Sequence, residues 1–213
     1  MRPYFAAAIA GLGLVGCASV PPPPPVLAFD RHDCAEVDLM RAISLTPDKE
    51  KALHSVTTVI DSATPCATFA SGASAYVLFA VPEDFEDKTL TVGAALEATR
   101  IFSPAVSVLD AAGQETRRFA SDEFMYRGAN FSVLFRPRAA ERYVLVSTDA
   151  SRVGQRYDSI NIGTSSTATY TPYGGATFTS GIDAALSRAF SYEGSALVVI
   201  NDSDPKEKPA EQR

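Results

Sequence analysis

The sequence predicts an all-β protein, an antiparallel β-sandwich of the jelly-roll type with one or two short helices. Short runs of β-branched and aromatic residues recur after Ser55, and turn residues separate them. No alternation of strands and helices, the pattern of a parallel sheet, is present. Of the 213 residues, 46% are hydrophobic and 21% are charged, which is the composition of a chain that builds a core.

Seven runs are the expected strands: 56–60, 75–81, 89–92, 105–109, 131–135, 143–146 and 197–200. The run at 89–92 alternates apolar and polar residues, as a strand buried on one face does. The run at 143–146 is continuously apolar, which favours a central strand buried on both faces. A weaker strand is expected at Ile160 and 167–170.

Two segments have helical spacing. In 35–42, Val37, Met40 and Arg41 follow it, and Pro47 would end the helix. In 182–189 the apolar side chains fall on one helix face, so that this helix could cover an open end of the sandwich.

Between these elements, residues 151–181 are expected to form a long loop rich in Ser, Thr, Gly and Tyr. The loop holds four aromatic residues as candidate ligand-binding groups: Tyr157, Tyr170, Tyr173 and Phe178. Such rings can stack on sugars while neighbouring hydroxyls bind the sugar hydroxyls. The alternative is that the rings pack on the sheet and the hydroxyls face water; the absence of Trp favours that alternative.

The N-terminus predicts secretion and lipidation. A positive start and a short apolar run describe a signal peptide at 1–16, and the apolar run leads into Leu14-Val15-Gly16-Cys17. This resembles a bacterial lipobox, in which the Cys17 thiol would carry diacylglycerol with acyl chains such as palmitate. The alternative is an ordinary cleaved signal with an incidental cysteine. No Asp follows Cys17, so the expected location is the outer membrane, on its periplasmic face.

The expected organisation after the leader has three parts. Residues 17–28 would be the lipidated cysteine and a proline-rich tether, since Pro21 to Pro25 favour polyproline II. Residues 29–201 would form a single β-sandwich domain, and 202–213 a disordered polar tail. The net charge of −6, without a block of Lys and Arg, argues against nucleic acid as a partner.

Cys34 and Cys66 are expected to form a disulfide, because an even pair remains once Cys17 carries lipid and the periplasm is oxidising. The alternative is two unpaired buried thiols. A metal site is not expected, since His32 and His54, the two histidines, do not complete a zinc spacing with these cysteines.

No catalytic residue and no cofactor is expected, so the protein is interpreted as a non-enzyme. A Gly-x-Ser-x-Gly elbow, a phosphate loop and a dinucleotide fingerprint are all missing from the sequence. The acidic cluster Glu83, Asp84, Glu86 and Asp87 is interpreted as a solvated turn, with a calcium site as the alternative. Six arginines could form a basic face or be ordinary surface charge, the latter being favoured: Arg117, Arg118, Arg127, Arg136, Arg138 and Arg142.

Three segments carry a family likeness: the block Arg100 to Asp110, Leu134-Phe-Arg-Pro137, and Arg142 to Thr148 with its Tyr-Val-Leu-Val core. They resemble the maltose-operon periplasmic protein family. The resemblance implies an envelope β-sandwich linked to maltose or maltodextrin uptake, with no catalytic site to carry over. The expected function is therefore a non-catalytic accessory of carbohydrate uptake that binds a glucan or a porin or transport partner. The alternative is an envelope assembly or structural lipoprotein that binds other proteins.

Overall fold

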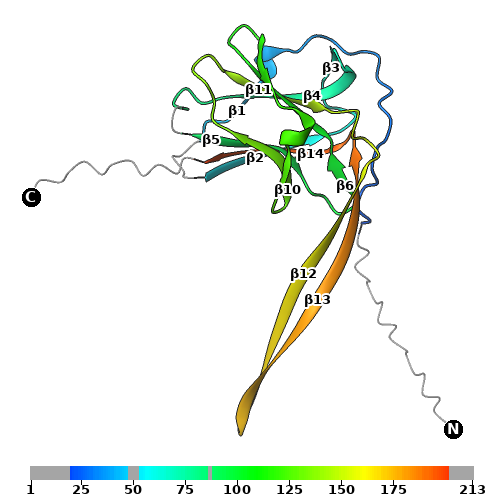
Figure 1. Ribbon diagram of the computed structural model, residues 1–213, viewed down its shortest axis with the longest axis vertical. Helices are drawn as coiled ribbons and strands as arrows, with labels where there is room; N and C mark the ends of the chain where they lie inside the picture. The colour runs from blue at the N-terminus through cyan, green and yellow to red at the C-terminus, as the bar shows by residue number, and fades with distance from the viewer. Residues whose placement is uncertain (1–19, 48–52, 86–87, 202–213) are drawn as a thin grey trace, which may run out of the picture.

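The computed structural model describes residues 20–47, 53–85 and 88–201. Two large β-sheets lie face to face, and a long two-stranded ribbon projects from one end of them (Figure 1). The first seven strands are β1 (Ile43–Ser44), β2 (Leu53–Ile60), β3 (Cys66–Phe69), β4 (Gly72–Ala80), β5 (Thr89–Ala95), β6 (Arg100–Phe102) and β7 (Pro104–Leu109). The others are β8 (Glu115–Arg118), β9 (Met125–Arg127), β10 (Asn130–Phe135), β11 (Tyr143–Thr148), β12 (Arg156–Thr171), β13 (Gly174–Ser191) and β14 (Gly194–Asn201).

The strands form three sheets. The six-stranded sheet has the order β1-β4-β11-β7-β8, with β3 also paired to β4, and the five-stranded sheet has the order β2-β14-β5-β10-β9. The third sheet is β12-β13-β6. The pairs are antiparallel except β1 with β4 and β13 with β6, which are parallel. The predicted fold class, an all-β antiparallel sandwich, is confirmed.

The main core lies between the two large sheets. The six-stranded sheet contributes Phe79, Val106 and Val144, and the five-stranded sheet contributes Leu90 and Val198, all fully buried. Because strand side chains alternate between faces, each sheet places every second residue of its inner strands in this core.

A smaller cluster covers the outer face of the six-stranded sheet. It contains Tyr76, Leu78 and Leu145, and the N-terminal segment packs over it through Val37 and Leu39. Strand β11 lies between β4 and β7 in the sheet, and its apolar side chains enter the main core on one face and this cluster on the other. The continuous apolar run at 143–146 is thereby confirmed as a central strand.

The expected helix at 35–42 is wrong apart from one turn. Only η1 (Leu39–Arg41) is helical, as a 3-10 turn in which the Asp38 carboxylate accepts from the Met40 backbone N–H. Upstream, the Ala35 N–H donates to the Cys66 carbonyl oxygen at 3.2 Å. The segment is paired at both ends: Ala35 bridges to Ala67 in β3, and β1, which follows the segment, pairs with β4. This pairing keeps the segment extended, since a helix this short gains little stability by itself. A second 3-10 turn, η2, spans Ser121–Glu123.

The expected loop at 151–181 and the expected helix at 182–189 are also wrong. Residues 156–189 belong to the hairpin of β12 and β13, which pair without interruption on either side of its turn, and only 151–155 precede it as turn. The eight residues of the helical pattern are too few to separate a helix from a strand, and pairing with β12 satisfies the backbone of β13 along its length. The weaker strand expected at Ile160 and 167–170 lies within β12.

Candidate interaction site

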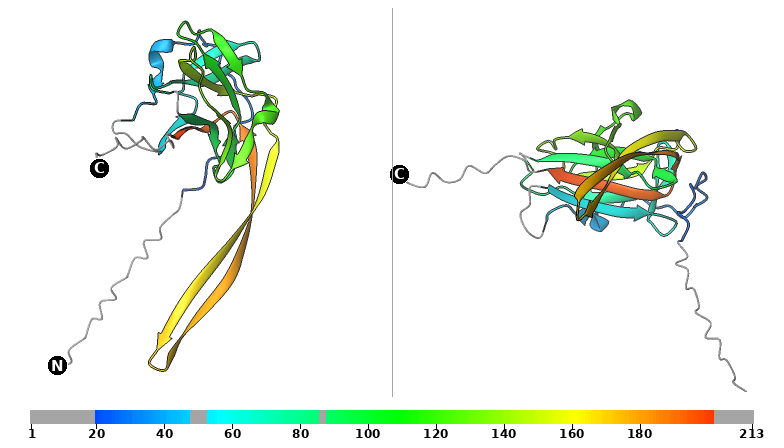
Figure 2. Two further views of the ribbon diagram at one scale, coloured as in Figure 1. Left: turned by 60° about the vertical axis from the view of Figure 1, so that its left-hand side comes forward. Right: turned by 90° about the horizontal axis from the view of Figure 1, so that it is seen from below.

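Strands β12 and β13 form a hairpin, called the arm below, that projects from the end of the sandwich (Figures 1 and 2). Register runs from Arg156 opposite Ala189 to Thr171 opposite Gly174. At 3.4 Å per residue, the 16 residues of β12 span roughly 54 Å. Threonine, which favours extended backbone, recurs in both strands, and β12 also contains Tyr157 and Tyr170.

The tip of the arm is a tight turn at Pro172 and Tyr173. The Thr171 hydroxyl donates to the Gly174 carbonyl oxygen at 2.9 Å and accepts from the Tyr173 N–H at 3.4 Å. Gly174 has a φ of +146°, a conformation that other residues rarely adopt. The Tyr170 ring covers Gly175 so closely that an added Cβ would lie 2.9 Å from it. Sequence and turn geometry therefore fix where the chain reverses.

The outer part of the arm is exposed and almost uncharged. Every residue from 165 to 181 is exposed, and Tyr170, Tyr173 and Phe178 are 84%, 100% and 66% exposed. Between Ser159 and Ser187 the sequence holds one charged residue, Asp183. Edge strands of soluble proteins usually carry Lys or another charge that deters pairing with a further strand. The arm lacks this protection.

Both edges of the arm are open to a further strand over most of their length. Within the part of the chain that the structure describes, β12 pairs with β13 alone. β13 also pairs with β6, through Ala189, Phe190 and Ser191. An antiparallel strand that lacks a neighbour presents alternate N–H and C=O groups outward, which is a template for strand addition.

The base of the arm is held rigidly against the sandwich. The rings of Tyr157 and Tyr126 stack with centroids 3.7 Å apart and an interplanar angle of 10°. Burial, together with the neighbouring Tyr157, raises the pKa of Tyr126 to about 12. Opposite Tyr157, Arg188 donates to the Ser159 hydroxyl at 2.8 Å and to the Glu97 carbonyl oxygen. These contacts set the direction in which the arm leaves the sandwich.

The proline-rich segment docks at the same end of the molecule. The Pro23 carbonyl oxygen accepts from the Thr99 hydroxyl at 2.5 Å. The Val26 N–H donates to the Ser191 hydroxyl at 2.8 Å, and the Val26 carbonyl oxygen accepts from the Tyr192 N–H at 2.9 Å. Residues 23–26 thus run along the end of β13, next to the base of the arm.

The four aromatic residues expected to bind a ligand do not form one platform. Tyr157 lies at the base of the arm, whereas Tyr170, Tyr173 and Phe178 lie toward its tip. Directly opposed residues share a face, and Tyr170 opposes Gly175 while Phe178 opposes Thr167. Phe178 therefore shares a face with Thr167. Since Thr167 and Tyr170 are three residues apart on one strand, they point to different faces, and Tyr170 and Phe178 lie on opposite faces of the arm. The expected lipidation residue, Cys17, lies outside the described residues.

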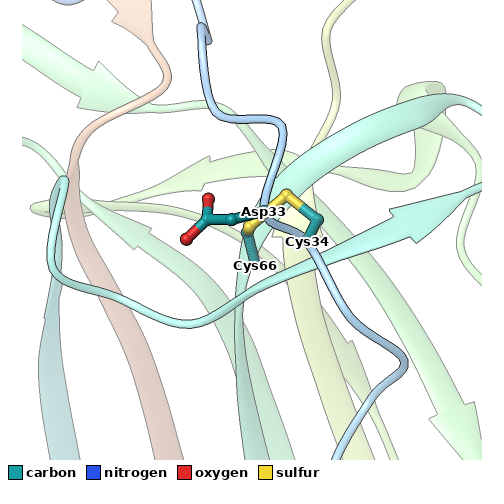
Figure 3. Close-up of side chains that lie close together, drawn as sticks. All are labelled: Asp33, Cys34 and Cys66. Atoms are coloured by element: carbon teal, nitrogen blue, oxygen red, sulfur yellow. A yellow bond between two sulfur atoms is a disulfide. The ribbon is translucent and has the colours of Figure 1, made fainter.

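The expected disulfide is present: Cys34 and Cys66 are joined, with Asp33 beside them (Figure 3). These three residues are a group of potential metal ligands in the described part of the chain, but disulfide sulfurs provide no thiolate for a metal. The Asp33 carboxylate accepts from Arg31 at 3.2 Å, and this bond lowers the pKa of Asp33. The geometry fits a structural disulfide that holds the N-terminal segment against the sandwich. Arg31 adds to this connection by donating to the Thr64 carbonyl oxygen at 2.5 Å.

Four of the six clustered arginines are engaged with groups of the same protein. Arg117 pairs with Glu141 at 2.8 Å, and Arg118 pairs with Glu115 at 2.7 Å. Arg127 donates to the Ser132 carbonyl oxygen, and Arg142 donates to the Ala139 carbonyl oxygen at 2.8 Å. Such intramolecular pairing favours ordinary structural and surface charge over a basic binding face.

The other polar candidates are scattered. His32 is exposed beside the disulfide, while His54 lies at the start of β2. Of the acidic cluster, Glu83 and Asp84 are exposed and Asp84 pairs with Lys88 at 2.8 Å, whereas Glu86 and Asp87 lie outside the described residues. The two described members of the cluster, Glu83 and Asp84, thus face solvent, as residues of a turn between strands do.

Two cavities of about 200 Å³ each lie in the described part of the sandwich. One lies under the N-terminal segment, between Phe29, Tyr192 and the turn after β2. The other lies between the β8–β9 connection and the end of β11. Both are below the roughly 300–1,000 Å³ usual for small-molecule sites. The arm is therefore the stronger candidate for function.

No protein-family model, curated protein or solved structure matches this chain. Among the described residues, no helix has the length and apolar character needed to cross a bilayer.

Sequence reasoning missed the arm because its strands have no buried face over most of their length. One signal was available: Pro172, Tyr173 and two glycines interrupt two stretches that are dense in Thr, Ser and aromatic residues. A turn between two stretches of strand-forming residues is the pattern of a hairpin. Because apolar and polar residues do not alternate in these stretches, the strands were not recognised.

Proposed function

We propose that this chain is a non-catalytic lipoprotein of the bacterial envelope that acts by binding protein through its arm. The observation that carries this proposal is the arm itself, a hairpin of 16- and 18-residue strands whose outer part has open edges and almost no charge. Strand addition to such an edge supplies main-chain hydrogen bonds to a partner and needs no cavity.

The anchoring part of the proposal rests on the sequence. The leader and Cys17 support lipidation, and the absence of Asp after Cys17 supports the outer membrane, on its periplasmic face. The docking of residues 23–26 beside β13 adds a geometric consequence. A lipid on Cys17 would hold the sandwich with the base of the arm toward the anchor.

Lipidation is tested by labelling cells with radioactive palmitate. The wild-type chain takes up label, and Cys17→Ser does not. Label on the Cys17→Ser chain, or none on the wild type, would refute the lipid anchor and would leave the proposal about the arm unaffected.

Protein binding by the arm is tested with a photo-crosslinking residue at Tyr173, in intact cells. The matched control carries the same residue at Gln114, which is exposed in the turn between β7 and β8. We expect a discrete protein adduct from position 173 and none of that size from position 114. The same adducts from both positions, or none from position 173, would contradict a role for the arm.

A second candidate is the carbohydrate accessory that the family resemblance implies. The exposed rings of Tyr170 and Tyr173 near the tip favour it, because exposed aromatic faces can stack on sugars. Electrophoresis in a gel that contains maltodextrin tests it. Retardation that Tyr170→Ala with Tyr173→Ala abolishes would support sugar binding, and unretarded migration of the wild type would reject it.

A further inference from the structure

We propose that the partner of the arm is the arm of a second copy of this chain, paired edge to edge. This inference deepens the proposed function, on which it rests. In this arrangement the open edge of β12 in one copy pairs with the open edge of β13 in the neighbouring copy.

The first argument is charge. Two identical surfaces repel one another when either carries a block of like charge, and edge lysines prevent strand pairing in this way. From Ser159 to Ser187 the single charged residue is Asp183, and the single proline, Pro172, lies in the turn. A charged partner finds no complement on this surface, whereas a second arm meets no opposing charge block.

The second argument is strand direction. Within one arm β12 and β13 are antiparallel, so two arms that point the same way place β12 of one copy antiparallel to β13 of the next. Copies anchored by Cys17 in one membrane leaflet would point the same way. Pairing between neighbours would then repeat the pairing within each arm.

The third argument is space. The arm extends well beyond the sandwich in Figure 1 and in the left view of Figure 2, so a second arm can lie beside its outer part. β6 occupies the edge of β13 at Ala189–Ser191, which confines the pairing to the part of the arm beyond its base. Since the two edges differ, the contact is heterologous, and each copy can have a neighbour on both sides.

The side chains suit such a contact. The Ser166 and Thr179 hydroxyls lie 2.9 Å apart across the arm, and threonines recur along both strands. Cross-strand hydroxyl pairs of this kind stabilise antiparallel neighbours and can continue onto a third strand.

The experiment measures the mass of the full-length chain in detergent by light scattering, over a range of concentrations. The arm variant is Thr167→Lys with Thr177→Lys, one substitution on each strand. The matched control is Ala111→Lys with Gln114→Lys in the exposed turn after β7, which adds the same charge. We expect a wild-type oligomer, an oligomer in the control, and a dissociation constant about tenfold or more higher in the arm variant, since lysine on an edge strand deters pairing with a further strand. A monomeric wild type, or an arm variant that assembles like the control, overturns the proposal.

A second measurement tests the arrangement. Single cysteines are placed at Ser166 in one preparation and at Thr179 in another, two positions that are opposite in the repeated register, and a short bis-maleimide is added to each alone and to the mixture. Cys34 and Cys66 are joined, so the introduced thiol is the reactive one in the described chain. Side-by-side arms predict more crosslinked dimer in the mixture than in either single-cysteine preparation alone. Crosslinked dimer that forms in the separate preparations but does not increase in the mixture overturns that arrangement.

Failure here is distinguishable from failure of the proposed function. A monomeric wild type whose arm forms adducts with a different protein at position 173 refutes self-pairing and leaves the arm as a protein-binding element. A monomeric wild type without any adduct at that position refutes both.

Discussion

Glu141 is the most deeply buried charged side chain among those described, with 1% of its surface exposed. Its Oε2 accepts from Arg117 at 2.8 Å and from the Arg138 N–H at 2.8 Å. The Arg117 guanidinium lies over the rings of Phe119 and Phe135, 5.0 and 4.8 Å from their centroids. Removing one partner of such a pair leaves the other charge buried without compensation.

We therefore expect Glu141→Ala to lower the free energy of unfolding by about 3 kcal/mol or more. The control is Glu115→Ala, which breaks the exposed pair with Arg118 and should cost about 1 kcal/mol or less. Urea denaturation at neutral pH measures both. Equal losses in the two variants would show that the buried pair has no special weight.

Asp149 connects the end of β11 to the segment that leads into the arm. Burial raises the pKa of this carboxyl, but hydrogen bonds from Ser151 and Ser121 and the charge of Arg152 outweigh burial, so that the pKa lies below its usual value. The Ser151 hydroxyl donates to Oδ1 at 2.6 Å and the Ser121 hydroxyl donates to Oδ2 at 2.9 Å.

A lowered folded-state pKa means that the unfolded chain binds a proton at Asp149 more readily than the folded chain does. Its contribution to stability is present above the unfolded pKa of about 3.9 and is lost as the pH falls through the lower folded pKa. We expect Asp149→Asn to flatten the decline of the urea midpoint between about pH 5 and pH 3. Parallel pH profiles of wild type and variant would contradict this role.

The outer part of the arm does not touch the core of the sandwich. Residues 165–181 are all exposed, whereas Phe190 and Arg188 at its base are buried. The outer arm should therefore fold on the sandwich without stabilising it.

Shortening the arm tests this independence. Asn161 lies opposite Ala184, so deletion of residues 162–183 and insertion of Asn-Gly closes the hairpin with a two-residue turn. We expect the thermal midpoint to change by no more than about 3 °C, equivalent to under about 1 kcal/mol. Calorimetry measures it, and a large loss would mean that the outer arm packs on the sandwich.

In the whole molecule, the disulfide fastens the N-terminal segment to the sandwich. Cys34 and Cys66 are 32 residues apart in sequence, and the segment between them contributes Val37 and Leu39 to the outer cluster. Closing a loop of this length restricts the unfolded chain, with a stabilisation of about 3–4 kcal/mol.

We expect Cys34→Ala with Cys66→Ala to lower the free energy of unfolding by about that amount. The wild type in reductant should match the variant, and the variant itself should not respond to reductant. Urea denaturation with and without reductant measures this, and an unchanged midpoint would show that the bridge adds no stability.

The sequence by itself determined the sandwich. Turn residues and short β-branched runs placed the seven strong strands, and the continuous apolar run at 143–146 identified β11 as central. These features are local, because burial on one or both faces leaves its period in the sequence. The two remaining cysteines were enough to predict the disulfide.

Tertiary structure alone decided the arm, the pairing of Arg117 with Glu141, and the separation of Tyr170 from Phe178. Over its outer part the arm buries no face, so no apolar period marks it, and its strands are defined by the residues opposite them. Glu141 looks like any surface carboxylate until β8 brings Arg117 beside it. Which side chains meet depends on register between distant segments, and local composition does not contain register.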